Sequence, residues 1–347
     1  MTLPWGPAVA TGVGSMPGDN ALEAARIVAG ELPDFVHVVE LPARGPGADM
    51  VGRTGALLAG VEVGFGLETT PDGWRFAGAI GRQTRRAASF LNEDLDALEE
   101  STQRYAGPVK AQVVGPWTMA AAVELRSGER ALSDPGAVSE LADALAAALI
   151  EHVADLRRRV PGASAIVVQV DEPGLPAVLD GRIGTASGLS RYAAVDPQVT
   201  GRVLSRVLGA APDAITGVHC CASRPPVALL REAGAAFVSL DLIGVDDQTD
   251  QALGHLLEAG EGLIAGTVPS TGSGRLSDTA ASAAIRGLLD RLGLNDPHTL
   301  ARIAVSPTCG LAGASPSWAR TALAACAAVG RVLRQDEVEE GPNDRRG

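Results

Sequence analysis

Short apolar segments alternate with helix-forming segments along almost the whole chain of 347 residues. The apolar segments are rich in β-branched residues and are expected to be strands, at residues 8–13, 35–41, 109–114, 165–170, 214–218, 236–240, 262–268 and 301–305. The segments between them are amphipathic or alanine-rich and are expected to be helices, at residues 20–32, 92–101, 119–126, 134–159, 197–210, 225–235, 249–260, 278–292 and 315–333. A repeated strand–helix unit implies a parallel sheet. Eight such units fit a closed (β/α)8 TIM barrel, an α/β fold, better than an open doubly wound sheet.

One segment interrupts the alternation after the second expected strand. Residues 64–82 carry a Thr-Thr-Pro-Asp-Gly turn sequence between two short runs, which predicts an inserted β-hairpin. No linker divides the rest, so residues 1–334 are expected to form a single catalytic barrel domain. Residues 335–347 are rich in charge, and we expect a disordered tail there.

Composition and charge exclude several kinds of partner. The formal net charge is -12 at pH 7 and no basic cluster stands out, so binding to nucleic acid is not expected. The N-terminus has no basic region followed by an apolar one, and no apolar stretch is long enough to span a bilayer. We therefore expect a cytoplasmic protein without a membrane partner. In a reducing compartment, four cysteines serve more often as free thiols, metal ligands or catalytic groups than as disulfides.

Polar residues stand where most of the expected strands end. Active sites of TIM barrels are built at the C-terminal ends of the strands, so these residues are the candidates for a functional site. They include Ser15, Glu40, Asp171, His219, Cys221, Asp241 and Cys309.

A histidine and two cysteines lie together at the end of the fifth expected strand. Side chains alternate along a strand, so His219 and Cys221 share one face while Cys220 points to the other. Cys309 follows the eighth expected strand, and Asp241 ends the sixth. One nitrogen, two sulfurs and one carboxylate oxygen form a ligand set that suits Zn2+. Ordinary burial of the thiols and the histidine in the core is the competing interpretation, and a cysteine at a second strand end favours the metal.

The expected ligand set also limits the chemistry of the site. Two thiolates and a carboxylate give the site a net negative charge, which makes zinc a poor activator of water. Zinc in such a site can still bind a substrate thiol and keep its sulfur deprotonated near neutral pH. The ligands therefore favour alkylation of a thiol over hydrolysis.

Other strand ends offer groups for an amino-acid substrate. Residues 12–18 are only superficially like a dinucleotide-binding loop, because the third glycine is one place late and Pro17 interrupts the expected helix start. Ser15 and the nearby backbone are candidates for holding a substrate carboxylate, and a tight turn alone explains the same residues equally well. Asp171 could bind an ammonium group with help from Glu40, and a helix N-cap or a surface charge is the alternative.

Several short motifs follow one another along nearly the whole chain: Gly14-Ser15-Met16-Pro17, Lys110 with Gly115-Pro116-Trp117-Thr118, Val170-Asp171-Glu172-Pro173, His219-Cys220-Cys221 and Ser306-Pro307-Thr308-Cys309-Gly310-Leu311. In this order they resemble the catalytic barrel of the cobalamin-independent methionine synthase family. The resemblance implies a TIM barrel that binds zinc through His219, Cys221, an acidic residue and Cys309. It implies methylation of the sulfur of homocysteine to give methionine. It also implies that Ser15, Glu40 and Asp171 bind the amino-acid part of homocysteine.

Three features depart from the family pattern. Long family members carry a second, N-terminal barrel that helps to hold the polyglutamyl folate, and this sequence shows none. The acidic zinc ligand of the family is usually Glu, and the matching position here is Asp241. After the seventh strand the family has a His thought to protonate the departing folate, whereas residues 265–270 contain no histidine.

The missing histidine bears on the methyl donor. Methyltetrahydrofolate releases its methyl group from a tertiary amine that must be protonated, so a general acid is needed, while a methyl-corrinoid needs none. We therefore expect methylcobalamin or a corrinoid protein partner as the donor, with methyltetrahydrofolate as the alternative. Two further hypotheses are a zinc methyltransferase for another thiol, such as coenzyme M, and a metal-binding barrel that has lost catalysis.

Overall fold

The computed structural model of the protein describes residues 2–71, 73–243, 245–274 and 276–340. Its centre is a sheet of eight parallel strands, which are β1 (Val9–Ala10), β2 (Val36–His37), β5 (Val109–Val114), β7 (Ile166–Asp171), β8 (Ala214–His219), β9 (Phe237–Asp241), β10 (Gly262–Val268) and β11 (Ile303–Pro307). Their order in the sheet is β1-β11-β10-β9-β8-β7-β5-β2. Beyond β1 and β2, a parallel bridge between Ser15 and Glu40 joins the two edges. The sheet therefore curls on itself into a TIM-barrel-like α/β fold.

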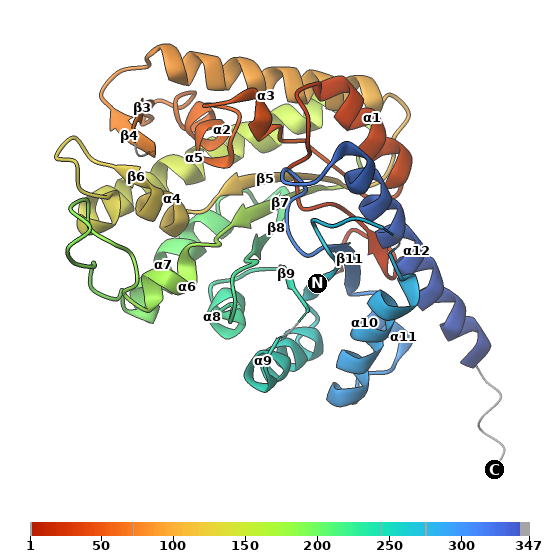
Figure 1. The fold of residues 1–347 in the computed structure, drawn as a ribbon. Helices are drawn as coiled ribbons and strands as arrows, with labels where there is room; N and C mark the ends of the chain where they lie inside the picture. Colours follow the sequence, from red (N-terminus) through yellow and green to blue (C-terminus); the bar gives the residue numbers. More distant parts are fainter. Residues whose placement is uncertain (1, 72, 244, 275, 341–347) are drawn as a thin grey trace.

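Helices cover the outside of this sheet (Figure 1). They are α1 (Ala21–Glu31), α2 (Met50–Leu58), α3 (Arg82–Ser101), α4 (Pro116–Ala122), α5 (Pro135–Arg159), α6 (Leu175–Leu179), α7 (Pro197–Leu208), α8 (Val227–Glu232), α9 (Asp247–Glu258), α10 (Asp278–Leu292), α11 (Pro297–Leu300) and α12 (Pro316–Glu340), with short 3-10 helices η1 (Pro42–Arg44) and η2 (Ala131–Ser133). Many helices begin at a residue whose side chain accepts a hydrogen bond from the backbone of the first turn; these caps are Asn20, Asp49, Asp134, Asp196, Asp246, Ser277 and Asp296. The last helix, α12, packs beside the first, α1.

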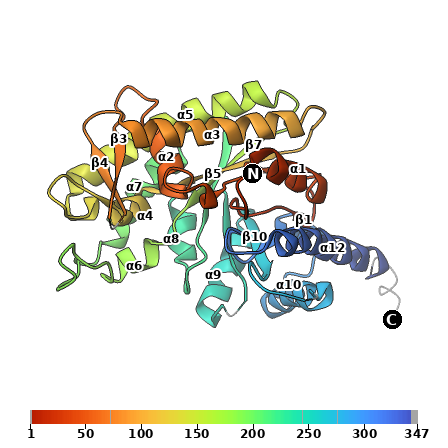
Figure 2. The same ribbon diagram turned by 45° about the horizontal axis from the view of Figure 1, so that its top comes forward.

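A second, smaller sheet lies at one side of the molecule, away from α12 (Figure 2). In it β3 (Gly66–Thr70) pairs antiparallel with β4 (Gly73–Ala77), and β6 (Val123–Glu124) pairs parallel with β4. The strands β3 and β4 lie within residues 64–82, for which the sequence predicts a hairpin, whereas β6 follows α4. Residue 72, in the expected turn, lies outside the described residues.

The interior of the barrel is apolar at the end where the strands begin. The ring of Trp5 stacks on Phe35 with centroids 5.4 Å apart and meets Phe237 edge-on at 5.6 Å. Glycines in the wall make room for these rings: a Cβ at Gly217 would lie 2.4 Å from Phe237, and one at Gly262 would lie 2.8 Å from Trp5. These three aromatic side chains close the bottom of the barrel, and the polar side chains at the strand ends lie toward the other end.

The C-terminal helix is longer than the sequence pattern indicates. It continues to Glu340 and so includes the first residues of the predicted disordered tail, 335–347. The remaining residues of that tail, 341–347, lie outside the described part of the chain.

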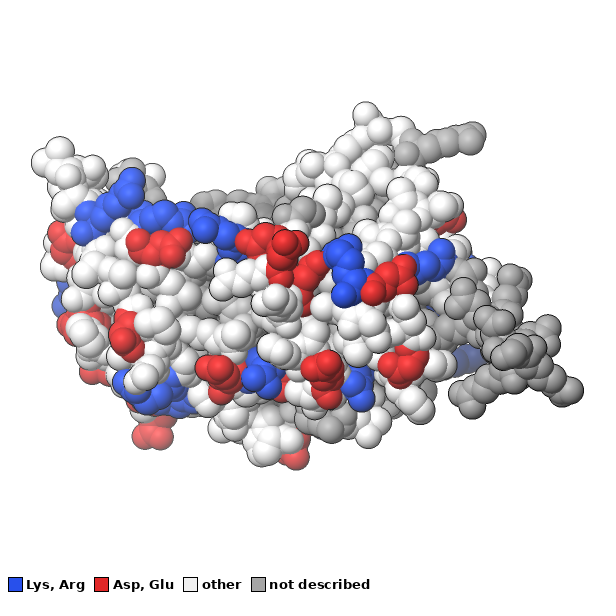
Figure 3. Space-filling model, turned by 90° about the horizontal axis from the view of Figure 1, so that it is seen from below, with Lys and Arg blue, Asp and Glu red and all other residues white. Residues whose placement is uncertain are grey.

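The surface carries charges of both signs in close alternation. On the face shown in Figure 3, Lys and Arg side chains are interspersed with Asp and Glu. None of the helices in the described ranges combines the length and apolar character needed to cross a membrane.

Candidate metal centre and substrate site

His219, Cys221 and Cys309 come together at the C-terminal end of the barrel. His219 ends β8, Cys221 lies two residues further, and Cys309 follows β11. Their ligand atoms lie within 4.8 Å of one another, and the two sulfurs are 3.0 Å apart. One ion placed among them can therefore contact all three residues.

The two ring nitrogens of His219 have different surroundings. Its Nδ1 lies 2.9 Å from the hydroxyl of Ser239, the residue that pairs with His219 across β8 and β9. Its Nε2 is buried and has no hydrogen-bond partner among the described residues. A buried ring nitrogen without a partner is costly, and a metal ion is a partner that would satisfy it.

The two cysteines behave as one acid–base pair. The hydrogen bond between their sulfurs lowers the pKa of Cys309 to about 4 and raises the pKa of Cys221. One of the two sulfurs is therefore a thiolate at neutral pH, and the thiolate is the form that binds metals. The donor set thus fits a zinc ion.

Asp241 stands beside the three clustered residues without joining them. Its Oδ1 accepts a hydrogen bond of 2.8 Å from the amide of Ile243. Partial burial raises the pKa of the Asp241 carboxyl, the Ile243 amide lowers it, and the charge of Cys309 adds a smaller rise. Of the four expected ligands, the structure brings three into one group and leaves Asp241 at its edge.

Ser15 and Glu40 meet at the bridge that closes the barrel. The Glu40 carbonyl accepts from the Met16 amide at 2.8 Å, and the Ser15 carbonyl accepts from the Leu311 amide at 2.8 Å. The second contact places Ser15 next to the cysteine loop after β11. A Cβ at Gly310 would lie 2.1 Å from the Ser15 hydroxyl oxygen, so the glycine leaves room for that side chain.

Asp171 ends β7 and pairs in register with His219 on β8. Its Oδ1 accepts a hydrogen bond of 2.7 Å from Nε2 of the Gln169 side chain. Burial raises the pKa of Asp171 to about 7, while the His219 ring lowers it and Glu40 raises it. Asp171 therefore lies within electrostatic reach of both the expected metal ligands and the expected substrate residues.

Glu172, the next residue, has a structural role. It is fully buried, and its carboxylate accepts hydrogen bonds from the Trp117 amide at 2.9 Å and the Thr118 amide at 2.7 Å. These amides lie in the first turn of α4, so Glu172 caps that helix from the neighbouring strand. Gly115 makes the approach possible, because a Cβ there would lie 2.3 Å from a Glu172 oxygen.

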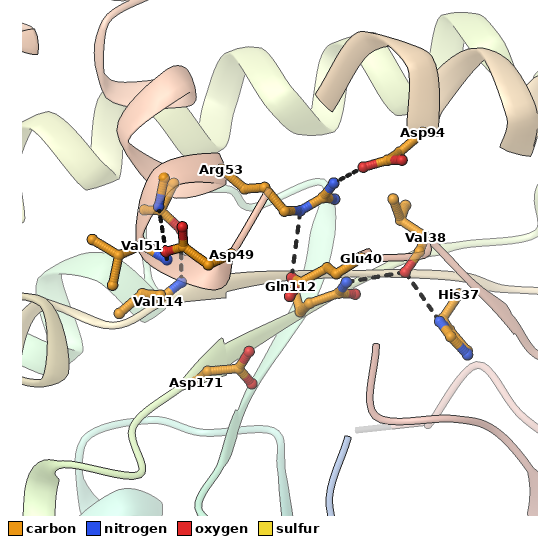
Figure 4. Close-up of polar contacts among 12 residues, drawn as sticks. His37, Val38, Glu40, Asp49, Val51, Arg53, Asp94, Gln112, Val114 and Asp171 are labelled. Carbon is orange, nitrogen blue, oxygen red and sulfur yellow. Dashed lines mark hydrogen bonds and ion pairs between the residues drawn. The ribbon is translucent and has the colours of Figure 1, made fainter. Parts of the chain in front are cut away.

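A buried ion-pair network holds the carboxylate of Glu40. The Arg53 guanidinium lies between Glu40, with Nε 3.6 Å from Oε1, and the carboxylate of Asp94 on α3 (Figure 4). Asp94 is fully buried and also accepts two hydrogen bonds from Arg44, at 2.7 and 2.8 Å. The network ties η1, α2 and α3 to the strand end that carries Glu40.

Several residues of this site were not predicted from sequence as members of it. Gln169, Ser239 and Arg53 are buried polar side chains that hold Asp171, His219 and Glu40 in place. A signal was present for Gln169, because it interrupts an otherwise apolar strand at the position two residues before Asp171.

The TIM-barrel-like fold carries a cluster of potential metal ligands at the C-terminal end of its strands, which is where enzymes of this fold have their active sites. The sequence profile of a protein family described as "Cobalamin-independent synthase, Catalytic domain" matches residues 8–331. The chain belongs to this family and is therefore a methyltransferase.

A solved structure supports the fold. The chain is similar to a structure described as a B12-independent methionine synthase from Shewanella sp. W3-18-1 in complex with selenomethionine, with a TM-score of 0.62. The match covers 96% of this chain and 99% of that one at 14% sequence identity, so it bears on the fold alone. No relative was found among curated protein sequences.

The family corrects the methyl donor expected from the sequence. Methylcobalamin, and with it a corrinoid protein partner, is wrong because the family is cobalamin-independent. That expectation treated the absence of histidine in residues 265–270 as the absence of a proton donor. The family shows that the absence of this one histidine does not identify the methyl donor.

Proposed function

We propose that the protein transfers a methyl group from methyltetrahydrofolate to the sulfur of homocysteine and so forms methionine. The observation that supports this most directly is the group of His219, Cys221 and Cys309 in a chain of the cobalamin-independent synthase family. The transfer forms a sulfur–carbon bond and breaks the nitrogen–carbon bond of the folate, whose nitrogen takes up a proton.

Zinc is the metal that best suits the cluster, with Asp241 as the fourth ligand. The Ile243 amide engages Oδ1 of Asp241, which leaves Oδ2 as the ligand atom. When bound, the ion would supply a positive centre that keeps the thiol of the substrate deprotonated at neutral pH. Ser239 holds the His219 ring in the orientation that directs Nε2 to the ion.

The amino-acid part of homocysteine is assigned to Ser15, Glu40 and Asp171. The hydroxyl of Ser15 donates to the substrate carboxylate, and the carboxylates of Glu40 and Asp171 accept from the substrate ammonium. Support comes from the position of all three at the strand ends that surround the metal cluster. We further propose that residues 1–334 act as one catalytic unit in the cytoplasm, where a reducing environment keeps the cysteines available.

The choice of donor can be tested with purified protein loaded with zinc. With homocysteine as acceptor, methionine is expected to form with methyltetrahydrofolate and not with methylcobalamin, because the family does not depend on cobalamin. Methionine is measured by mass spectrometry, with zinc-free protein as the control. Turnover with methylcobalamin alone would contradict the proposal, and methylation of coenzyme M in place of homocysteine would contradict the proposed acceptor.

A methyl group added beside Ser15 should weaken substrate binding. In Gly310→Ala, the new Cβ would lie 2.1 Å from the Ser15 hydroxyl oxygen, so that side chain must turn away. The KM for homocysteine is expected to rise about tenfold, the cost of one lost charge-assisted hydrogen bond, with bound zinc unchanged. Gly313→Ala is the matched control, because its Cβ would make only ordinary contact, 3.6 Å from Thr271. Equal KM values in the two variants would argue against a role for Ser15 in binding.

A further inference from the structure

Lys110 is a buried cation for which the proposed reaction has no direct use. It lies in β5, its side chain is fully buried, and it ranks among the largest side chains sealed inside the protein. Burial lowers the pKa of Lys110 to about 8, while the negative charges of Asp171 and Glu40 raise it. A buried ammonium group is costly unless its donors are satisfied, so the partners of Lys110 are informative.

The ammonium group of Lys110 donates to two neutral oxygens. Nζ lies 2.8 Å from the carbonyl of Val13 and 2.7 Å from Oε1 of Gln169. An ammonium group has donors only, so it requires the oxygen end of the Gln169 amide to face it. The nitrogen end of that amide must then point the other way.

The nitrogen end of Gln169 reaches the expected substrate site. Nε2 donates to Oδ1 of Asp171 at 2.7 Å and to the carbonyl of Val13 at 3.0 Å. Both amide protons are therefore used, and one oxygen of Asp171 is held in a defined position. The three contacts agree on this orientation, because Asp171 and Val13 accept from Nε2 while Lys110 donates to Oε1. Without the ammonium group, the buried Oε1 of Gln169 would lose this donor.

The same pair holds the turn that carries Ser15. The Val13 carbonyl accepts from both Lys110 and Gln169, and Val13 lies two residues before Ser15. The two side chains thus connect β5 and β7 to the end of β1, across the polar end of the barrel. Gln169 therefore contacts Asp171 directly, and both side chains hold the backbone two residues before Ser15.

We propose that Lys110 is a positioning residue which, through Gln169, presents the carboxylate of Asp171 to the ammonium group of an amino-acid substrate. The inference rests on the proposed function, since it takes homocysteine as the ligand. A positioning role can be told apart from a purely structural role for Lys110. If Lys110 positions Asp171, its loss should weaken the binding of ligands that carry an ammonium group more than the binding of ligands that lack one.

The test compares two thiols that differ in that group alone. Homocysteine and 4-mercaptobutanoate, which is homocysteine without its amino group, are titrated calorimetrically into zinc-loaded parent protein and into Lys110→Met. The parent should prefer homocysteine, and Lys110→Met should narrow this preference by about tenfold to a hundredfold, the range for a charge-assisted hydrogen bond. Binding of 4-mercaptobutanoate should stay within a few-fold of the parent value.

A second variant and a double variant complete the test. Gln169→Met removes the donor to Asp171 and should narrow the preference as Lys110→Met does, which covers the case of a Lys110 variant that does not fold. In a double-mutant cycle, Lys110→Met combined with Asp171→Asn should lose little more homocysteine affinity than Asp171→Asn alone.

The outcomes separate the two proposals. Three results would overturn the role of Lys110. They are an equal weakening of the binding of both thiols in Lys110→Met, an unchanged preference for homocysteine in that variant, and additive losses of homocysteine affinity in the double variant. Absence of homocysteine binding by the parent protein would overturn it as well. Binding with the expected preference but without methyl transfer would overturn the proposed function and leave the positioning role supported.

Discussion

Replacing Cys309 by serine should remove zinc from the protein and abolish methyl transfer. Cys309 supplies one of the two sulfurs of the cluster, so its loss leaves only His219 and Cys221 as clustered ligands. Loss of a direct ligand should weaken zinc binding by more than the roughly 10–100-fold cost of losing a residue that only orients a ligand. Zinc per chain is measured by elemental analysis after dialysis, and activity is measured as methionine formation.

Cys326→Ala provides the control for this experiment. Cys326 is a buried free thiol on α12 and is not a member of the cluster. This variant should keep its zinc even if it loses some stability, because the mutation leaves a small cavity far from the ligands. Unchanged metal content in Cys309→Ser would rule out the proposed ligand set.

The substitution Asp94→Asn should strongly destabilise the fold. The fully buried Asp94 carboxylate neutralises Arg44 and Arg53, whose side chains are 6% and 5% exposed. Breaking a buried ion pair by removing one partner costs about 3–5 kcal/mol, because the remaining charges stay buried without compensation. The free energy of unfolding of Asp94→Asn, measured by urea denaturation, should fall by that amount.

The adjacent residue offers a matched control. Glu93 also pairs with Arg44, at 3.3 Å, but its side chain is 57% exposed. Exposed pairs contribute about 0–1 kcal/mol, so Glu93→Gln should unfold almost as the parent does. If the two variants are equally stable, the arginines must find other partners and the network does not hold the strand end of Glu40 as described.

The barrel strands were predicted well because each is a short apolar run with a helix after it. The runs at 109–114 and 262–268 coincide with β5 and β10. The edge strands β1 and β2 were expected to be longer than the two residues each contains, since a local pattern cannot show that the pairing of the closing edges continues only as the Ser15–Glu40 bridge.

Helix α2 was missed for a reason that lies in its packing. It contains Gly52 and Gly55, and glycine has a low helix propensity. A Cβ at Gly52 would lie 2.5 Å from the backbone of Gly47, and one at Gly55 would lie 2.2 Å from Leu67. The close contacts with Gly47 and Leu67 require glycine at these two positions, and a local sequence pattern does not show such contacts.

The proximity of His219 and Cys221 could be predicted from strand alternation, whereas the residues that support the site could not. His219 and Cys221 share a face because they are two residues apart on an extended segment, which is a local rule. The contact of Arg53 with Asp94 joins residues that are far apart in the sequence, and the oxygen of the Gln169 amide accepts from a lysine on another strand. These contacts depend on the tertiary structure and not on the local sequence.

The barrel has its shortest strands at the place where the two edges of the sheet meet. β1 and β2 contribute two residues each, and beyond them the bridge between Ser15 and Glu40 closes the circle. An amino acid bound by both side chains would link the two edges of the sheet. Because it binds only the closed barrel, it would stabilise that form. The bridge already closes the barrel without substrate. A bound amino acid is therefore expected to make opening along this edge less frequent than in the empty protein.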